Sequence, residues 1–363
     1  MNQEVNYRLP AEWEPQQAVL LTWPHAATDW AYCLADITDT FVQIADAITR
    51  EECLIIATPE PDDVQRLLTG LLTDAQCRRI RFCHCPTDDT WARDHGFITL
   101  APDQAGHPLR LLDFRFNGWG EKFPASHDNA INRHLYEQGL LTGEYESHDD
   151  FVLEGGSIES DGLGTVFTTS MCLLAPHRNQ PLSREQIEEQ LKRRLHAERV
   201  VWLDHGLLEG DDTDGHIDTI VRCAPDDTLL YVGCDDTADT QYDTFRQLEE
   251  QLRSLRTVEG APYRLIRLPM PRAIYEDDYR LPATYANFLV INGMVLYPTY
   301  AQADNDEAAR AAIQAAFPHH RLTAIDARTI IRQHGSIHCL TMQAPSTSLS
   351  EGAPTPTLPE GRE

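Results

Sequence analysis

Apolar residues follow a helical spacing in six segments of the chain. In each segment they recur at intervals of three and four residues, with polar residues between them, which is typical of a helix with one buried face. Ser183 followed by Gln186 forms a capping box, and Asp304 precedes an alanine-rich run, so both of these helices have a defined start. The predicted helices cover residues 36–49, 61–73, 128–139, 183–195, 238–255 and 304–316.

Short apolar segments after most of these helices predict strands, and a polar loop follows each strand. The strands are expected at 79–82, 199–203, 263–268 and 321–325. Alternating segments around Gly, Asp or Pro turns predict hairpins as well. The paired segments are HGFITL with LRLLDF, VLEGGSI with GTVFTTS, HIDTIVR with DTLLYVG, and NFLVI with MVLYPTY.

A unit of helix, strand, polar loop and hairpin therefore recurs, at intervals of roughly 55 to 65 residues. The last strand, SIHCLTM, has no partner downstream, and AVLLTW at 18–23 is available to pair with it. Five units closed by the two ends of the chain predict a circular α/β propeller. The same elements also fit an ordinary α/β sandwich.

One domain is expected, at residues 1–343. Residues 344–363, APSTSLSEGAPTPTLPEGRE, are rich in Pro, Ser, Thr, Gly and Glu and have little to bury, so a disordered tail is predicted there. No comparable linker interrupts the rest of the chain.

Composition and charge narrow the partners. The 42% of apolar residues is typical of a globular protein, while 57 acidic against 30 basic residues give a net charge of −27, which disfavours nucleic acid and fits a small cationic ligand. No apolar run reaches the ~18 residues of a membrane span. Nine cysteines without paired spacing, and an N-terminus without a signal-peptide pattern, predict free thiols in the cytoplasm.

Clusters of polar residues come directly after the strand in several units. In a ring these loops converge at the axis, where a ligand site is expected. The clusters are TDDTWARDHG at 87–96, DDFVLEGGS at 149–157, GDDTDGHID at 210–218 and HGSIHC at 334–339.

Two metal sites were weighed against these clusters. A calcium loop with Gly215 in its glycine slot places Gly210 first and Val221 last, where two ligands are required. For zinc, the candidates lack the paired spacing of a structural site, and core thiols are the favoured interpretation of the two cysteines; these candidates are Cys83, His84, Cys85 and His205. The prediction is that no metal is bound.

A histidine, a cysteine and several carboxylates remain. His216 and Asp218 are one residue apart at the start of a predicted strand, so their side chains are expected on one face, as a proton-transfer pair or as surface polarity. Cys339 alone fits a buried thiol. Together with Asp94 and Glu154, they suit a planar guanidinium, which carboxylates bind through its N–H groups and a thiolate attacks at carbon.

Several motifs in order along the chain resemble the agmatine deiminase and bacterial peptidylarginine deiminase family of guanidino-modifying enzymes. The resemblance implies a five-bladed pseudo-symmetric α/β propeller of the pentein type, in a single domain, and a homodimer. The motifs are LPAEWEP at 9–15, TDDTWARD at 87–94, FNGWG at 116–120, LEGGSI at 153–158, DDTDGHID at 211–218, LPATYANFLVING at 281–293 and SIHC at 336–339.

The resemblance also implies a role for each site residue. Cys339 is the expected nucleophile and His216 the general acid and base, while Asp94, Glu154 and Asp218 hold the guanidinium. The remaining expected substrate contacts are Trp91 and Trp119, with core aromatics as the alternative, and Asp88 and Asp89 at the ammonium, with surface acids as the alternative.

The implied reaction is hydrolysis of agmatine to N-carbamoylputrescine and ammonia through a Cys thiouronium intermediate, a step of polyamine biosynthesis without metal or organic cofactor. A peptidylarginine deiminase is the nearest alternative, and a non-catalytic binder of a cationic ligand is the alternative of another class. The nucleophile loop RQHGSIHC and the segments RDHGF and FNGWGE depart from the agmatine deiminase pattern, which leaves recognition of the substrate's far end open.

Overall fold

The structure is a computed structural model that describes residues 5–346. Within them the strands form five mixed sheets of three or four strands and one two-stranded sheet, β14 (Ile274–Glu276) with β15 (Tyr279–Leu281). Each mixed sheet combines parallel and antiparallel pairs. In spatial order the mixed sheets contain β1 (Tyr7–Arg8), β5 (Ile98–Pro102), β6 (Arg110–Arg115) and β7 (Glu144–Val152); β10 (Arg199–Leu203), β9 (Thr165–Thr169) and β8 (Ile158–Ser160); β11 (Val221–Ala224), β12 (Thr228–Gly233) and β13 (Arg264–Pro269); β16 (Leu289–Ile291), β17 (Met294–Thr299) and β18 (Arg321–Asp326); and β19 (Thr341–Pro345), β2 (Gln16–Thr22), β3 (Cys53–Thr58) and β4 (Ile80–His84).

The two ends of the described chain meet in one sheet. β19 pairs antiparallel with β2, with Thr341 opposite Leu21, so the predicted pairing of the last strand with the segment at 18–23 is confirmed. β19 starts later than predicted and runs to Pro345, past the expected domain boundary at 343. The rest of the predicted tail, residues 347–363, lies outside the described residues.

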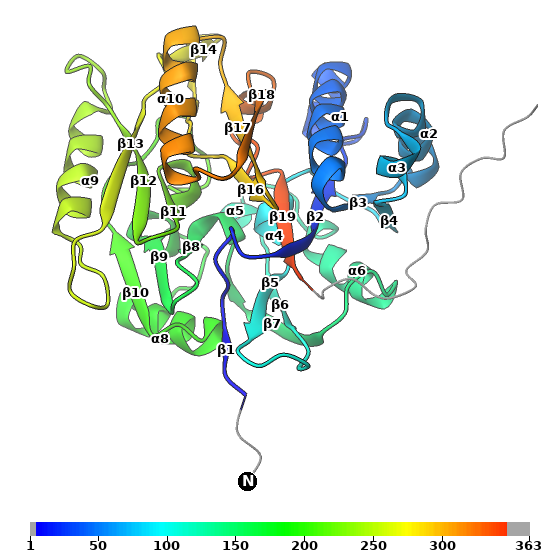
Figure 1. The fold of residues 1–363 in the computed structure, drawn as a ribbon, viewed down its shortest axis with the longest axis horizontal. Helices are drawn as coiled ribbons and strands as arrows, with labels where there is room; N and C mark the ends of the chain where they lie inside the picture. The colour runs from blue at the N-terminus through cyan, green and yellow to red at the C-terminus, as the bar shows by residue number, and fades with distance from the viewer. Residues whose placement is uncertain (1–4, 347–363) are drawn as a thin grey trace, which may run out of the picture.

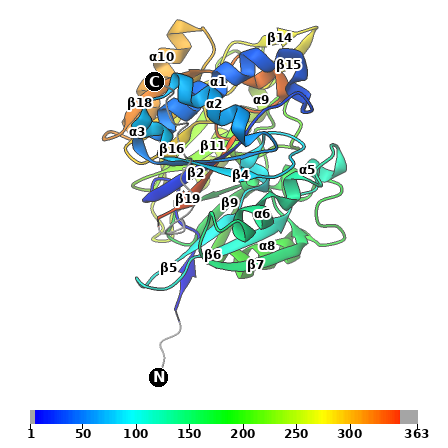
Figure 2. The ribbon, with the colours of Figure 1, turned by 90° about the vertical axis from the view of Figure 1, so that its right-hand side faces the viewer.

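Helices cover the outside of the sheets (Figures 1 and 2). All six predicted helices form, and Ser183 and Gln186 make the expected capping box. The fifth begins at residue 242 instead of 238, because the side chains of Asp236 and Asp239 accept backbone N–H groups and hold the preceding residues in turns. The six helices are α1 (Leu34–Glu51), α2 (Pro61–Leu71), α6 (Ile131–Glu137), α8 (Arg184–Leu195), α9 (Tyr242–Ser254) and α10 (Ala303–Ala316).

Two predicted hairpin strands are shorter than expected. β8 begins only at Ile158, and β11 begins only at Val221, so His216 and Asp218 do not lie on a strand. Asp218 is instead in a short 3-10 turn, η4 (Ile217–Thr219), which Thr219 stabilises by donating its hydroxyl to the carbonyl of His216. The prediction that His216 and Asp218 share one face of a strand is therefore wrong.

Apolar side chains fill the space between helices and sheets. Ile44 on α1 is completely buried with Phe41 and Ile48 on the same helix face, at the helical spacing that the sequence predicted. No helix in residues 5–346 is both long and apolar enough to cross a bilayer.

Replacing Ile44 by Ala tests this packing. We expect the free energy of unfolding to fall by about 2–5 kcal/mol, because the substitution leaves a cavity in a core that cannot fully close. Urea denaturation measures the change. Gln43→Ala on the exposed face of α1 is the control and should change stability by less than about 0.5 kcal/mol; equal effects at both positions would contradict the assigned core face.

Candidate active site

Turns and loops from separate sheets bring the predicted chemical groups together. Asp94 lies in a one-turn helix, α4 (Ala92–His95), and Glu154 precedes the 3-10 turn η3 (Gly155–Ser157). Asp218 lies in η4, and Cys339 directly precedes the last strand. Asp94, Glu154, His216, Asp218 and Cys339 are all buried, with at most 4% of each exposed.

Asn287 and Asp218 surround the Cys339 side chain. The Cys339 Sγ lies 3.7 Å from Asp218 Oδ2, and Asn287 Nδ2 donates to it at 3.2 Å. The Asn287 Oδ1 accepts the backbone N–H of Cys339 at 3.2 Å, which fixes this loop. Burial, Asp218 and Asp94 together raise the pKa of Cys339 well above its usual value, so a cation must enter before the thiolate is favoured.

Asp94 faces His216 across the site. Its carboxylate accepts Trp119 Nε1 at 2.9 Å and the Gly156 N–H at 3.0 Å, and one oxygen lies 3.6 Å from His216 Nδ1. Burial raises the pKa of Asp94 to about 6, although the positive charge of His216 opposes the rise. A Cβ on Gly156 would lie 2.6 Å from His216 Nδ1, so only glycine fits between these two groups.

His216 is completely buried, and neither of its ring nitrogens has a hydrogen-bond partner in the described part of the protein. Burial alone lowers the pKa of His216, but Asp94, Cys172 and Glu154 raise it, and the result is a pKa well above the usual value. The imidazole is thus held as a proton donor next to Asp94.

His338 bridges Asp218 and Glu12, with both ring nitrogens 2.7 Å from a carboxylate oxygen. A neutral imidazole has a single N–H, so only the imidazolium donates to both carboxylates. Burial raises the pKa of Asp218, but His338 lowers it by more, and Asp218 remains ionised beside Cys339. The SIHC motif contained His338, yet its spacing gave no sign of these two partners.

Arg178 holds Glu154. Its Nε donates to Glu154 Oε1 at 2.7 Å, and its Nη1 donates to Asp214 Oδ2 at 2.9 Å. Glu154 Oε2 has no hydrogen-bond partner among the described residues, so one carboxylate oxygen is available to a ligand. The sequence gave no reason to select Arg178, because it lies outside every motif.

A cavity with about 370 Å³ of empty space leads to Cys339. Trp91 and Trp119 line it, as does Asp89, which also accepts Trp91 Nε1 at 3.1 Å. Among the described residues its lining includes no Lys or Arg. Its acidic members are Asp29, Asp89, Asp94 and Asp212.

Asp88 and Asp212 differ from the expectation drawn from the sequence. Asp88 does not line this cavity, because its carboxylate accepts the backbone N–H and Nδ1 of His127 at 2.7 and 2.8 Å. Asp212, to which the sequence gave no role, does line it. Burial raises the pKa of Asp212 to about 6, with His334 opposing the rise.

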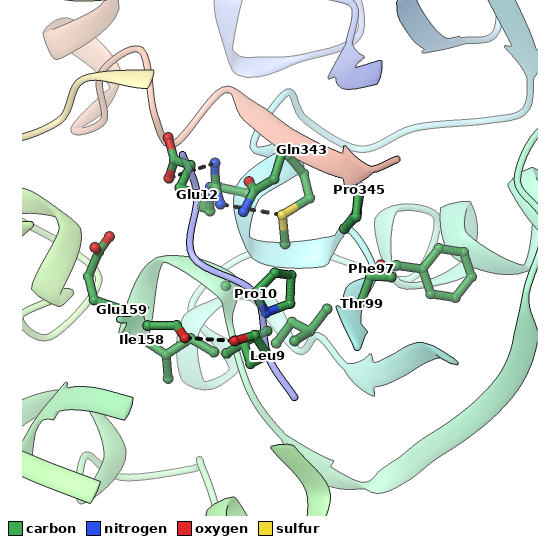
Figure 3. A pocket seen from close by; sticks show the side chains of 14 residues that line it. Leu9, Pro10, Glu12, Phe97, Thr99, Ile158, Glu159, Gln343 and Pro345 are labelled. Carbon is green, nitrogen blue, oxygen red and sulfur yellow. Dashed lines mark hydrogen bonds and ion pairs between the residues drawn. The ribbon is translucent and has the colours of Figure 1, made fainter. Parts of the chain in front are cut away.

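A second cavity, with about 530 Å³ of empty space, lies beside Glu12 (Figure 3). Figure 3 shows Leu9, Pro10 and Ile158 near the charged groups Glu12 and Glu159. None of the predicted site residues lines this cavity. The cavity at Cys339 is therefore the candidate substrate site.

The sequence matches the family model of the Porphyromonas-type peptidyl-arginine deiminases over residues 8–345. The chain belongs to this family. Within the deiminase family, it is 32% identical over 362 residues to the agmatine deiminase of Stutzerimonas stutzeri, across 94% of this chain and 96% of that one.

Solved structures agree with this assignment. A Porphyromonas gingivalis protein, provisionally described as an arginine deiminase, is 46% identical with a TM-score of 0.89, covering 95% of this chain and 100% of that one. A C. jejuni agmatine deiminase variant with substrate bound is 32% identical with a TM-score of 0.86, covering 96% and 99%. The mixed α/β fold is thus the fold of these deiminases.

The Cys339 thiol in this deiminase-family protein provides a direct test of the site's electrostatics. In Asp218→Asn we expect Cys339 to be alkylated several-fold faster near neutral pH, because a negative charge that raises its pKa is removed. Peptide mapping after timed iodoacetamide treatment measures the rate. Asp243→Asn, at a side chain that is 83% exposed, is the control; slower or unchanged labelling in Asp218→Asn would contradict the assigned cause.

Proposed function

We propose that the protein is an agmatine deiminase, which hydrolyses the guanidinium of agmatine to N-carbamoylputrescine and ammonia. The observation that carries this proposal is the acidic cavity at Cys339, whose described lining includes four aspartates and neither Lys nor Arg. Agmatine is cationic at both ends and has no carboxylate, so its charges complement this lining. The relatives named agmatine deiminase support the same substrate.

The guanidinium binds among Asp94, Asp218 and the free oxygen of Glu154. Carboxylates match the planar N–H groups of a guanidinium through charge-assisted hydrogen bonds. Its positive charge offsets the charges of Asp218 and Asp94 that raise the pKa of Cys339. Substrate binding therefore favours the thiolate where the empty site favours the thiol.

Cys339 then attacks the central carbon of the guanidinium, and a C–S bond forms. His216 gives its proton to one nitrogen of the tetrahedral intermediate, the C–N bond breaks, and ammonia leaves. The product of this half-reaction is a thiouronium joined to Cys339, with His216 now neutral.

Water completes the cycle. His216 takes a proton from the water molecule, the resulting hydroxide attacks the thiouronium carbon, and collapse breaks the C–S bond. The ureido product leaves, and the Cys339 thiolate and the protonated His216 are restored. Every step in this proposal uses side chains of the protein and water, without a metal or organic cofactor.

A peptidylarginine deiminase is the second candidate. The description of the family model and the 46% identity to the Porphyromonas gingivalis protein favour it. Such a substrate has neutral peptide groups where agmatine has an ammonium, so the acids at the cavity mouth would add little to its binding. A non-catalytic binder has less support, since it has no use for a thiol at the end of the cavity.

The five mixed sheets are further proposed to be the five blades of a pseudo-symmetric propeller, closed where β19 pairs with β2. The turns that carry Asp94, Glu154, Asp218 and Cys339 belong to four of these units and meet at one site, which supports a central axis there. The homodimer, the cytoplasmic location and the single domain remain predictions.

Substitution of the two reacting groups tests the mechanism. We expect Cys339→Ser and His216→Ala each to lower ammonia release from agmatine by at least about 10³-fold, because each loses a group that acts in both half-reactions. Cys53→Ser, at a half-buried thiol on β3, should retain full activity. Normal turnover by either site variant would exclude the role assigned to that residue.

A comparison of substrates tests the choice of agmatine. We expect Asp212→Asn to raise KM for agmatine several-fold while leaving KM for butylguanidine, which lacks the ammonium, nearly unchanged. Asp243→Asn is the control. Higher kcat/KM for an arginine-containing peptide than for agmatine would instead identify a peptidylarginine deiminase.

A further inference from the structure

Cys172 is a second buried thiol close to the site. It lies in a one-turn helix, α7 (Ser170–Leu173), that follows β9, and it is completely buried. Its Sγ, one carboxylate oxygen of Glu154 and one ring nitrogen of His216 all lie within 4.8 Å of one another. The proposed hydrolysis gives Cys172 no task.

The other two members of this group have polar atoms without partners. Both nitrogens of His216 and the Oε2 of Glu154 are buried and have no hydrogen bond within the described residues. Unpaired polar atoms are rare in protein interiors, and they indicate that a ligand binds here. A guanidinium satisfies Glu154 and His216 but gains nothing from a sulfur atom.

A sulfur, a nitrogen and an oxygen are the donor set that Zn²⁺ prefers, whereas Mg²⁺ and Ca²⁺ prefer oxygen alone. Zinc bonds of roughly 2.0–2.3 Å in a tetrahedral site require the three atoms to approach by about 1 Å. The charges also fit, since Glu154 and a Cys172 thiolate balance the dication while Arg178 stays on the opposite oxygen of Glu154.

We propose that Glu154, Cys172 and His216 form an inhibitory zinc site. On binding, the Cys172 thiol releases its proton to solvent and the thiolate bonds to the metal. Because zinc occupies the imidazole and the carboxylate that the guanidinium requires, zinc and substrate exclude each other. The expectation of no metal came from considering the loop at 210–218 by itself, while Glu154 and Cys172 come from other loops.

Zinc binding is measured directly in the full-length Cys339→Ser protein, so that the predicted nucleophile contributes no ligand. We expect one equivalent of Zn²⁺ to bind, in competition with a chromophoric chelator, and Co²⁺ to give a thiolate-to-metal charge-transfer band. Adding Cys172→Ser should weaken Zn²⁺ binding at least tenfold and abolish the band. Cys223→Ser, at another buried thiol, is the matched control and should change neither.

Equal zinc affinity with and without Cys172, or a Cys339→Ser protein without the charge-transfer band, would overturn the site. The band is recorded without altering Cys172, so it decides the matter even where Cys172→Ser lowers the melting temperature. The inhibitory half rests on the proposed function and is tested separately. Agmatine should raise the apparent Kd for Zn²⁺ in the Cys339→Ser protein.

The two proposals fail in different ways. Zinc binding through Cys172 in a protein that releases no ammonia from any guanidine would leave the metal site standing and remove the deiminase. Full deiminase activity that zinc inhibits equally in the wild type and in Cys172→Ser would do the reverse.

Discussion

The arrangement of this protein depends on burying carboxylates at its centre and balancing them with buried cations. Arg222 is 1% exposed and binds Glu159 at 2.6 Å and Glu12 at 2.7 Å, and Arg178 binds Glu154. Unpaired charges in such a place are strongly destabilising, so each pair must form for the core to close. Glu12 also accepts the N–H of Val290, and therefore the N-terminal segment is tied to β16 by the same network.

Asp94 is the exception that makes the site chemically useful. No arginine or lysine of the described chain pairs with it, and it relies on Trp119, the Gly156 N–H and the nearby His216. Its raised pKa, and the raised pKa of Cys339, both express a shortage of positive charge. A guanidinium supplies that charge, so the proposed substrate completes the electrostatics that the protein leaves unbalanced.

The sequence predicted the elements well because hydrophobic spacing is a local property. It also predicted the pairing of β19 with β2, since a strand without a neighbour needs one. It failed where side chains overrule spacing, as when Thr219 holds Asp218 in a turn, and where partners are distant. Asn287, His338 and Arg178 each act on residues that lie 24 to 120 positions away or across separate sheets, and no local pattern records such contacts.

The pairing of β19 with β2 has a consequence for biosynthesis. Cys339 stands two residues before β19, whose partner strand is among the first segments to leave the ribosome. Both Asp94 and His216 are made long before the thiol that they serve. A nascent chain therefore carries no assembled reaction centre, and reactivity toward metabolites arises only in the finished molecule, when its final strand is added to its first sheet.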